Sequence, residues 1–337
     1  MPMTLEDVAK ISGVSRSTVS RVVNGDPNVS DRTRTRVMGV IQELNFQPNL
    51  AARGLAAGHT RVLGLIMPTA VANIFTDPYF PLVIQGFSSA CNARDYSVML
   101  WLAEPEYERR MVGQLMHNGL VDGVTVSSAM VNDPIVDALV EAGLPLVMIG
   151  RLPNNPNVNY VDTDNFQGGR QATLHLLRLG HRRVATVTGP LNMVAGVDRL
   201  RGYQAALQER SLPFRQEMVV EGDFTEMGGY SAMMRLLPLR PDAVFIASDV
   251  MAMGAHRAIL EAGFRVPEDI AVVGFDDVPA AARGNLPLTT IRQPIPRLGV
   301  VAAETLIDVI EHPESQPRHI ILSTELVIRT SCGTVAA

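Results

Sequence analysis

The 337-residue sequence has no uninterrupted apolar run of the eighteen or so residues that a transmembrane helix needs. Its N-terminus also lacks the basic segment and apolar stretch of a secretory signal peptide. Hydrophobic residues make up 47% of the chain and charged residues 19%, which is typical of a folded globular protein. The length allows two or three domains, and we expect neither a membrane span nor export.

Cysteine is almost absent. Cys91 and Cys332 are far apart in the sequence, and neither belongs to a closely spaced pair. This pattern argues against a disulfide framework and against a zinc site, and it is typical of a protein of the reducing cytoplasm.

Catalytic and cofactor-binding motifs are missing as well. The seven histidines form no HExxH pair, and the chain has no GxSxG, GxGxxG or phosphate-binding loop. Asp162 and Asp164 could be a catalytic carboxylate pair, but they suit a crossover between two lobes better, with Asp164 capping the following helix. We therefore predict no enzyme activity, no cofactor and no metal.

The net charge of −5 argues, by itself, against a nucleic-acid-binding protein. The distribution of charge argues the other way. Residues 1–61 carry eight basic and five acidic side chains, a net charge of +3, whereas the remainder carries −8. A basic N-terminal segment on an acidic body suits a protein that contacts phosphates at one end only.

Residues 1–48 predict a head of three short helices. The expected N-caps are Thr4, with Asp7 completing a capping box, then Ser15 and Ser30. The second helix would cover residues 16–23, and the third would end near Leu44.

The first two of these helices have the spacing of a helix-turn-helix. Ala9 is small where the helices would touch, and Gly13 can adopt the positive φ of the turn. A small shared core would consist of Val8, Val14, Val19 and Val22. The second helix would then expose Arg16, Ser17, Ser20 and Arg21. Its N-terminal side chains would reach base edges in the major groove, and Thr18 and Ser20 would contact phosphate. The alternative is a three-helix cap with no role in nucleic-acid binding.

Residues 49–60 predict a linker. Part of this segment can form a helix, but it has no clear amphipathic face, and an isolated helix this short is marginal in water. We expect it to become helical only when another surface supports it.

From residue 61 short, continuously apolar segments alternate with helical ones, which predicts an α/β fold with buried parallel strands. The expected strands are 62–67, 97–102, 123–127, 145–149, 158–161, 183–187, 218–220, 243–247 and 270–275. The expected helices lie near 79–93, 105–118, 132–142, 165–179, 197–210, 226–237 and 249–262. We predict two doubly wound lobes with a cleft at the carboxyl ends of their strands, lobe 1 covering 61–162 and 294–318 and lobe 2 covering 163–293 and 319–337.

Eight sequence motifs, in order along the chain, resemble those of the lactose-repressor family of bacterial transcription regulators. They are TLEDVA at 4–9, GVSRSTVSRVVN at 13–24, VSDRTR at 29–34, FQPN at 46–49, GLI at 64–66, GHRRVA at 180–185, RLRGY at 199–203 and VGFDD at 273–277. The resemblance implies that Arg16 and Ser17 select bases and that Arg21 adds a contact. It also implies a hinge helix whose Leu55 wedges into the minor groove.

Gly54 departs from a good hinge helix, because glycine lowers helix propensity by about 1 kcal/mol relative to alanine. We expect the hinge to depend strongly on DNA and on the dimer partner. The DNA-binding residues that we expect are Thr4, Ser15, Arg16, Ser17, Thr18, Ser20, Arg21, Asn24, Ser30, Asn49, Ala52, Arg53 and Leu55.

The body also resembles periplasmic sugar-binding proteins, which implies a small-molecule effector between the lobes. The expected effector-binding residues are Tyr79, Phe80, Arg151, Arg199, Asp249 and Asp276. Charged side chains can bind hydroxyl groups in pairs, and an aromatic ring can cover the C–H face of a sugar. Simpler interpretations stay open. Asp249 and Asp276 can cap a helix or turn, and the two aromatic residues can pack the lobe.

These features predict a dimeric repressor that binds a near-palindromic operator and responds allosterically to a small molecule, a sugar being the favoured class. The alternative is the solute-binding protein of a sugar transporter. Such a protein has the same two lobes, but it must be exported and would not carry a helix-turn-helix head.

Overall fold

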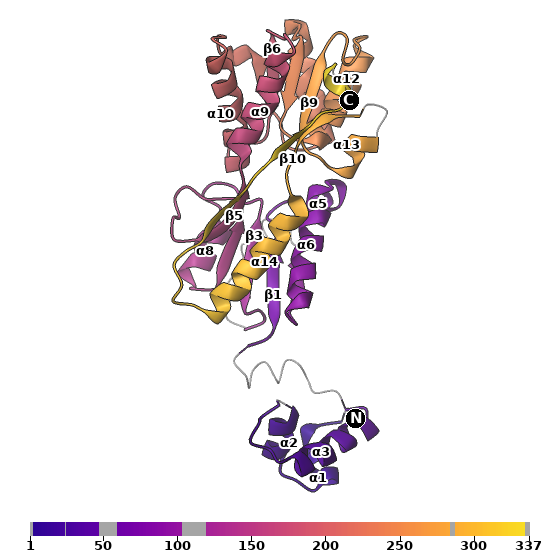
Figure 1. The fold of residues 1–337 in the computed structure, drawn as a ribbon, viewed down its shortest axis with the longest axis vertical. Helices are drawn as coiled ribbons and strands as arrows, with labels where there is room; N and C mark the ends of the chain where they lie inside the picture. The colour runs from indigo at the N-terminus through magenta and orange to yellow at the C-terminus, as the bar shows by residue number, and fades with distance from the viewer. Residues whose placement is uncertain (1–2, 24, 47–58, 103–118, 284–286, 334–337) are drawn as a thin grey trace. The chain divides into compact units, whose positions relative to one another are not determined.

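The computed structural model describes residues 3–23, 25–46, 59–102, 119–283 and 287–333. The chain separates into two compact units, Met1–Arg61 and Val62–Ala337, which we call the head and the body and describe one at a time (Figure 1).

The head contains three helices, α1 (Leu5–Ser12), α2 (Arg16–Val23) and α3 (Asp31–Glu43). They enclose a small core of Val8, Ala9, Val19, Val22, Val37 and Phe46. Gly13 ends α1 with a φ of 64°, which confirms the expected left-handed turn between the first two helices. Val14 is only partly buried beside this core.

Two of the three expected caps form as predicted. The Thr4 side chain accepts a hydrogen bond from the Asp7 amide in a full capping box, and Ser15 Oγ accepts one from the Thr18 amide at 3.1 Å. Ser30 stands at the N-cap of α3, but its hydroxyl donates to Thr33 Oγ1 and caps no backbone amide.

The body contains two six-stranded sheets, one in each lobe (Figure 1). The sheet of lobe 1 is parallel throughout, in the order β11-β5-β4-β3-β1-β2. Its strands are β1 (Val62–Ile66), β2 (Ser97–Trp101), β3 (Gly123–Ser127), β4 (Leu146–Ile149), β5 (Asn159–Thr163) and β11 (His319–Leu322). Its helices are α5 (Val71–Thr76), α6 (Tyr79–Ala93), α8 (Pro134–Glu141) and α14 (Ile295–Glu311).

The sheet of lobe 2 has the order β12-β10-β9-β8-β6-β7, and only its edge strand β12 is antiparallel to its neighbour. Its strands are β6 (Val184–Thr188), β7 (Val219–Glu221), β8 (Ala243–Ile246), β9 (Ala271–Asp276), β10 (Thr289–Arg292) and β12 (Glu325–Val327). Its helices are α9 (Asn165–Arg178), α10 (Val194–Glu209), α11 (Glu226–Leu236), α12 (Asp249–Glu261) and α13 (Pro279–Arg283). Short 3-10 turns cover Gln216–Met218, Leu237–Leu239 and Thr330–Cys332.

Helices cover both faces of each sheet, which is why the strands are apolar at nearly every position. In lobe 2, Val184 and Phe245 face the α9–α10 side, whereas the alternate residues Ala185 and Val244 face the α11–α12 side. Within the described residues no helix is long and apolar enough to cross a membrane.

One part of the predicted lobe boundary is wrong. We assigned residues 319–337 to lobe 2, but β11 pairs with β5 in the sheet of lobe 1, with Ile320 opposite Val161. The chain crosses to lobe 2 only after Leu322 and continues there as β12. The helix expected at 105–118 lies outside the described residues.

Candidate functional site: a cavity between the lobes and a helix-turn-helix face

A cavity of about 690 Å³ lies between the two lobes of the body. Its walls come from segments at the carboxyl ends of the strands, where ligands of doubly wound sheets bind. Five of the six predicted effector-binding residues line it: Tyr79, Phe80, Arg151, Arg199 and Asp276.

Arg199, on α10, is the central cation of the cavity. The residue is only 5% exposed, its Nε donates to Asn165 Oδ1 at 2.8 Å, and its Nη1 donates to the Ala247 carbonyl. Its guanidinium carbon lies 3.7 Å from the centroid of the Phe275 ring, a cation–π contact. Burial lowers the pKa of Arg199, and the neighbouring carboxyl groups oppose this effect, that of Asp276 most strongly.

Asp276 ends β9 and brings a carboxyl group into the same cavity. Its Oδ1 lies 3.7 Å from Arg199 Nη1 and accepts a hydrogen bond from Gln293 Nε2 at 2.6 Å. Burial raises the pKa of Asp276 to about 7, although the Arg199 guanidinium acts against this rise. Burial therefore favours the protonated form of this carboxyl group at higher pH than is usual for aspartate.

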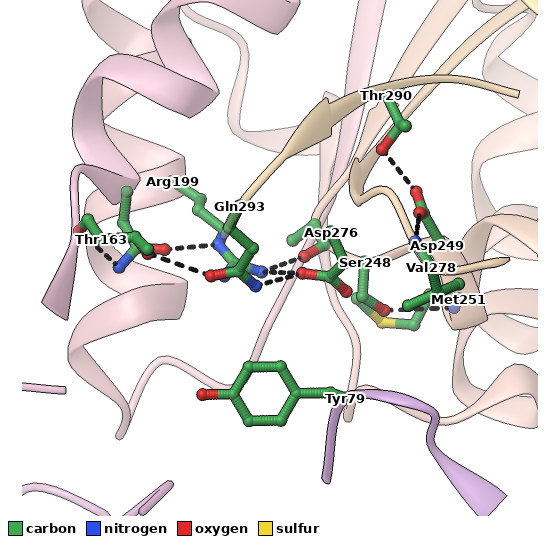
Figure 2. A network of polar contacts seen from close by, with 12 residues as sticks. Tyr79, Thr163, Arg199, Ser248, Asp249, Met251, Asp276, Val278, Thr290 and Gln293 are labelled. Atoms are coloured by element: carbon green, nitrogen blue, oxygen red, sulfur yellow. Dashed lines mark hydrogen bonds and ion pairs between the residues drawn. The ribbon is translucent and has the colours of Figure 1, made fainter. Parts of the chain in front are cut away.

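These two residues belong to a closed ring of polar contacts, drawn in Figure 2. Gln293 Oε1 accepts a hydrogen bond from Thr163 Oγ1 at 3.0 Å. Asn165 Nδ2 donates to the Thr163 carbonyl at 3.1 Å, and Arg199 closes the ring. Thr163 and Asn165 stand where the chain crosses from β5 into lobe 2, and Gln293 stands where it returns from β10 to α14. The polar groups of the cavity are thus bonded directly to two of the crossovers between the lobes.

Arg151 provides a second charged contact between the lobes. It follows β4 in lobe 1 and forms an ion pair with Asp198 on α10 of lobe 2. Its Nη1 also lies 3.8 Å from Asp162 Oδ2. Burial raises the pKa of Asp162, and Arg151 is the strongest influence in the opposite direction.

Aromatic side chains cover part of the cavity. Tyr79 and Phe80 meet edge to face, with ring centroids 5.4 Å apart, and Phe80 also packs into the core of lobe 1. Both of our interpretations, cavity wall and lobe packing, therefore hold for Phe80. Phe224 is a further aromatic wall residue, which the sequence analysis missed, and its backbone has a φ of 63°.

Asp249 has neither of the roles that we predicted for it. It does not line the cavity, and Ser248, which does, is the residue that caps α12. The Asp249 carboxylate is fully buried and accepts hydrogen bonds from the Val278 amide at 3.0 Å and from Thr290 Oγ1 at 2.6 Å (Figure 2). It therefore holds the segment after Asp276 in place and is not a wall residue of the cavity.

Asn165 and Gln293 also line the cavity and were not among the predicted site residues. Gln293 directly follows β10, and Asn165 follows β5 after the cap residue Asp164. A search for polar residues at the carboxyl ends of strands, which identified Asp276, could therefore have identified both. Asp162, which we expected to mark the crossover, is also a buried wall residue of the cavity, and Asp164 caps α9 as expected.

In the head, α2 presents a polar outer face. Arg16, Ser17 and Arg21 are exposed, whereas Thr18 and Ser20 are partly exposed. Arg16 lies 4.0 Å from Glu6 and Arg21 lies 3.8 Å from Asp26, and such exposed pairs are weak enough to open for another partner. Thr4, Ser15 and Ser30 are exposed at the helix starts. Five further expected contacts, Asn24, Asn49, Ala52, Arg53 and Leu55, lie outside the described residues.

A helix-turn-helix head and a two-lobed body with an interlobe cavity, in one chain, define a transcription regulator that responds to a small molecule. The model of "Bacterial regulatory proteins, lacI family" matches residues 4–49, and that of "Periplasmic binding protein-like domain" matches residues 173–332. The chain belongs to the lacI family.

Its relatives are similar along nearly the whole chain. The HTH-type transcriptional regulator CelR of Thermobifida fusca is 41% identical, over 97% of this chain and 98% of its own. The ribose operon repressor of Escherichia coli K12 is 36% identical, over 97% of this chain and 99% of its own.

Solved structures agree with this assignment. A CelR–cellobiose complex is 39% identical, with a TM-score of 0.78, and covers 98% of this chain and 99% of its own. A lac repressor dimer bound to operator and the anti-inducer ONPF is 29% identical, with a TM-score of 0.87 and the same coverage of both chains.

Proposed function

We propose that this protein represses transcription as a dimer on a near-palindromic operator, and that a neutral sugar in the interlobe cavity sets its affinity for that operator. A protein with this role acts in the bacterial cytoplasm, where the chromosome is, and needs no catalytic activity. The family supports the regulatory part of the proposal, and the chemistry of the cavity supports the class of effector.

The charge of the cavity wall is the observation that carries the choice of a neutral ligand. Five carboxyl-bearing residues line the cavity, namely Asp77, Asp162, Asp223, Glu226 and Asp276, against two arginines, Arg151 and Arg199. Both arginines already face carboxyl groups, so an anionic ligand would have to compete with those groups for the two cations of the wall as the structure describes it.

A polyhydroxylated neutral ligand suits the same wall. Carboxylates accept hydrogen bonds from hydroxyl groups, and Asn165, Asn192 and Gln293 offer amides that both donate and accept. The aromatic side chains of Tyr79, Phe80 and Phe224 can cover a sugar's C–H face. The CelR structure contains cellobiose and another relative is a ribose operon repressor, so cellobiose and ribose are the first ligands to test.

Titration calorimetry of the full chain with cellobiose, ribose and ribose 5-phosphate tests the class of effector. We expect one neutral sugar to bind and the phosphate ester not to bind. Tight binding of the anion with no binding of either neutral sugar would contradict the proposed class.

Operator binding is measured separately, with the DNA upstream of the protein's own gene and a scrambled duplex as control. We expect a sequence-preferring complex whose affinity changes when the effector is added. The effector's affinity must then change by the same factor when operator is added, because coupling between two sites is reciprocal. A solute-binding protein would bind sugar but show no sequence-preferring complex.

A further inference from the structure

The backbone around Asp276 has an unusual conformation. Asp276 has a φ of 118° and Asp277 a φ of 58°, and neither residue is glycine. Residues other than glycine adopt positive φ at a cost, and they keep it only where surrounding contacts enforce it. Two such residues in succession require a strong local restraint.

In addition to the hydrogen bond from the Val278 amide to Asp249, the Asp277 side chain provides such a restraint. Its carboxylate is only 8% exposed and accepts hydrogen bonds from Arg329 Nη2 at 2.6 Å and from Arg292 Nε at 2.7 Å. Arg329 also donates through Nη1 to the Leu288 carbonyl at 2.7 Å, and its amide donates to Thr289 Oγ1 at 2.8 Å. The carboxylate is thereby attached to β10 and to the segment after β12, and charge-assisted hydrogen bonds of this kind are strong.

Asp277 itself does not line the cavity. Its neighbour on one side is Asp276, and its partner Arg292 precedes Gln293, the residue that donates to the Asp276 carboxylate. The ion-paired carboxylate therefore fixes both the backbone that carries Asp276 and the strand end that carries its hydrogen-bond donor.

We propose that Asp277, held by Arg292 and Arg329, is a positioning residue for effector binding: it keeps the Asp276 carboxylate directed at Arg199 and Gln293. This inference rests on the proposed function, because it assigns the cavity to the effector. It adds a role for residues that have no contact with the ligand.

The crystal structure of the D277N variant tests the geometry without any ligand. We expect Asp276 to leave its positive φ and to lose the contacts with Arg199 Nη1 and Gln293 Nε2. An unchanged Asp276 in D277N would overturn the inference, whichever ligand the protein binds.

Calorimetry with cellobiose tests whether ligand affinity depends on Asp277. The D276N variant, which loses the carboxylate in the cavity itself, is the reference. We expect D277N to bind cellobiose about tenfold more weakly than the wild type, and R292M, which loses one of the two arginines, to show a smaller loss. The unfolding temperature without ligand serves as the readout of a purely structural role, and we expect R292M to lower it less than D277N does.

The D277G variant separates the side chain from the backbone. Glycine adopts a φ near 58° without strain, so D277G keeps the conformation available and removes only the ion pairs. We expect it to bind cellobiose as weakly as D277N does. Wild-type affinity in D277G would refute the positioning role of the carboxylate.

The control is D269N, which removes a two-bond arginine pair with Arg265 elsewhere on lobe 2 and should leave the affinity unchanged. If the wild type binds no cellobiose, then cellobiose is not the effector. The crystal structure of D277N would still test whether Asp277 positions Asp276. If the wild type binds, D276N fails and D277N binds normally, the proposed function stands and the inference falls.

Discussion

Arg199 is a fully engaged guanidinium in a cavity that is otherwise rich in carboxyl groups. It donates to an amide and to a backbone carbonyl, lies over an aromatic ring, and faces Asp276. Only a planar, forked cation can make these contacts together, and lysine, with a single compact ammonium group, cannot.

We therefore expect R199K to lower sugar affinity at least about tenfold while the chain stays folded, because lysine keeps the charge but loses the fork. Titration calorimetry measures the affinity, and thermal unfolding reports the fold. R201K is the matched control, since Arg201 lies on the same helix with its side chain 67% exposed. Equal affinity in R199K and R201K would remove Arg199 from the effector site.

The pKa of Asp276 leads to a prediction about pH. Burial raises this pKa from 3.8 to about 7, so the folded state holds a proton that the unfolded chain has already released. The contribution of Asp276 to the free energy of unfolding is fully present below the pKa of the unfolded chain. It is lost as the pH rises through the pKa of Asp276 in the folded state. We expect the free energy of unfolding of the wild type to fall, relative to D276N, between about pH 4 and pH 7.

Urea unfolding of both proteins at about pH 5 and about pH 8 measures this difference. D269N is again the control, because Arg265 lowers the pKa of Asp269 to about 2 and the carboxyl stays ionised throughout this range. A wild-type curve parallel to that of D276N would show that Asp276 ionises normally.

Strand ends and helix starts both guided us to residues of the site, and Asp249 is the one predicted effector-binding residue that does not line the cavity. Arg151 and Asp276 were found because each stands at or just after the end of an apolar run, and parallel strands bring their carboxyl ends to one edge. Asp249 also follows a strand, but a one-residue shift of the cap to Ser248 turned its carboxylate away from the cavity. Side-chain direction at a helix start depends on which residue caps it, and propensity cannot decide between neighbouring Ser and Asp.

Helices α9 and α10 pack closely because glycines stand at their contact. A Cβ added at Gly169 would lie 2.4 Å from the Arg199 carbonyl oxygen, and one at Gly202 would lie 2.3 Å from the Phe166 carbonyl oxygen. Backbone atoms cannot give way as a flexible side chain can. The position of Arg199 in the cavity thus depends on the small residues of α9.

We expect G169A to destabilise the body by about 1–3 kcal/mol, because a methyl group at this contact must push α10 aside. It should also weaken sugar binding, since α10 carries Arg199. G39A in the middle of α3 is the control: its Cβ would meet nothing within 4 Å, and alanine there should stabilise the helix by about 1 kcal/mol. Chemical denaturation of both variants measures the change, and a neutral G169A would contradict the close packing.

Most elements between residues 62 and 276 were predictable from sequence, but β10, α14, β11 and β12 were not among the expected elements, and neither was the sheet to which β11 belongs. Buried parallel strands such as β3 and β8 are nearly continuous apolar runs in the sequence, so local sequence alone predicts them. Strand β11 is an edge strand of four residues, and its pairing with β5 joins residues more than 150 positions apart. No local pattern determines such a pairing, so the lobe of this strand became clear only in the folded chain.

On the scale of the whole molecule, the two compact units divide the chemistry between them. The head has a net positive charge and an exposed basic helix, whereas the body has a net negative charge and contains the cavity. Nonspecific attraction to phosphates therefore belongs to the head. Regulation requires that a change in the body reaches the helices of the head through residues 49–60, where the family resemblance places a leucine wedge.

We expect L55A to weaken binding to the operator by at least about tenfold while binding to scrambled DNA changes little, because an apolar wedge acts through bending and unstacking of a specific site. Fluorescence anisotropy with both duplexes at one salt concentration measures the two affinities. Sugar affinity in the absence of DNA provides the control, since a change in the linker leaves the cavity's own residues intact. If L55A lost affinity for both duplexes equally, Leu55 would be a general contact or a folding residue. The link between effector and operator would then have to run through another part of the chain.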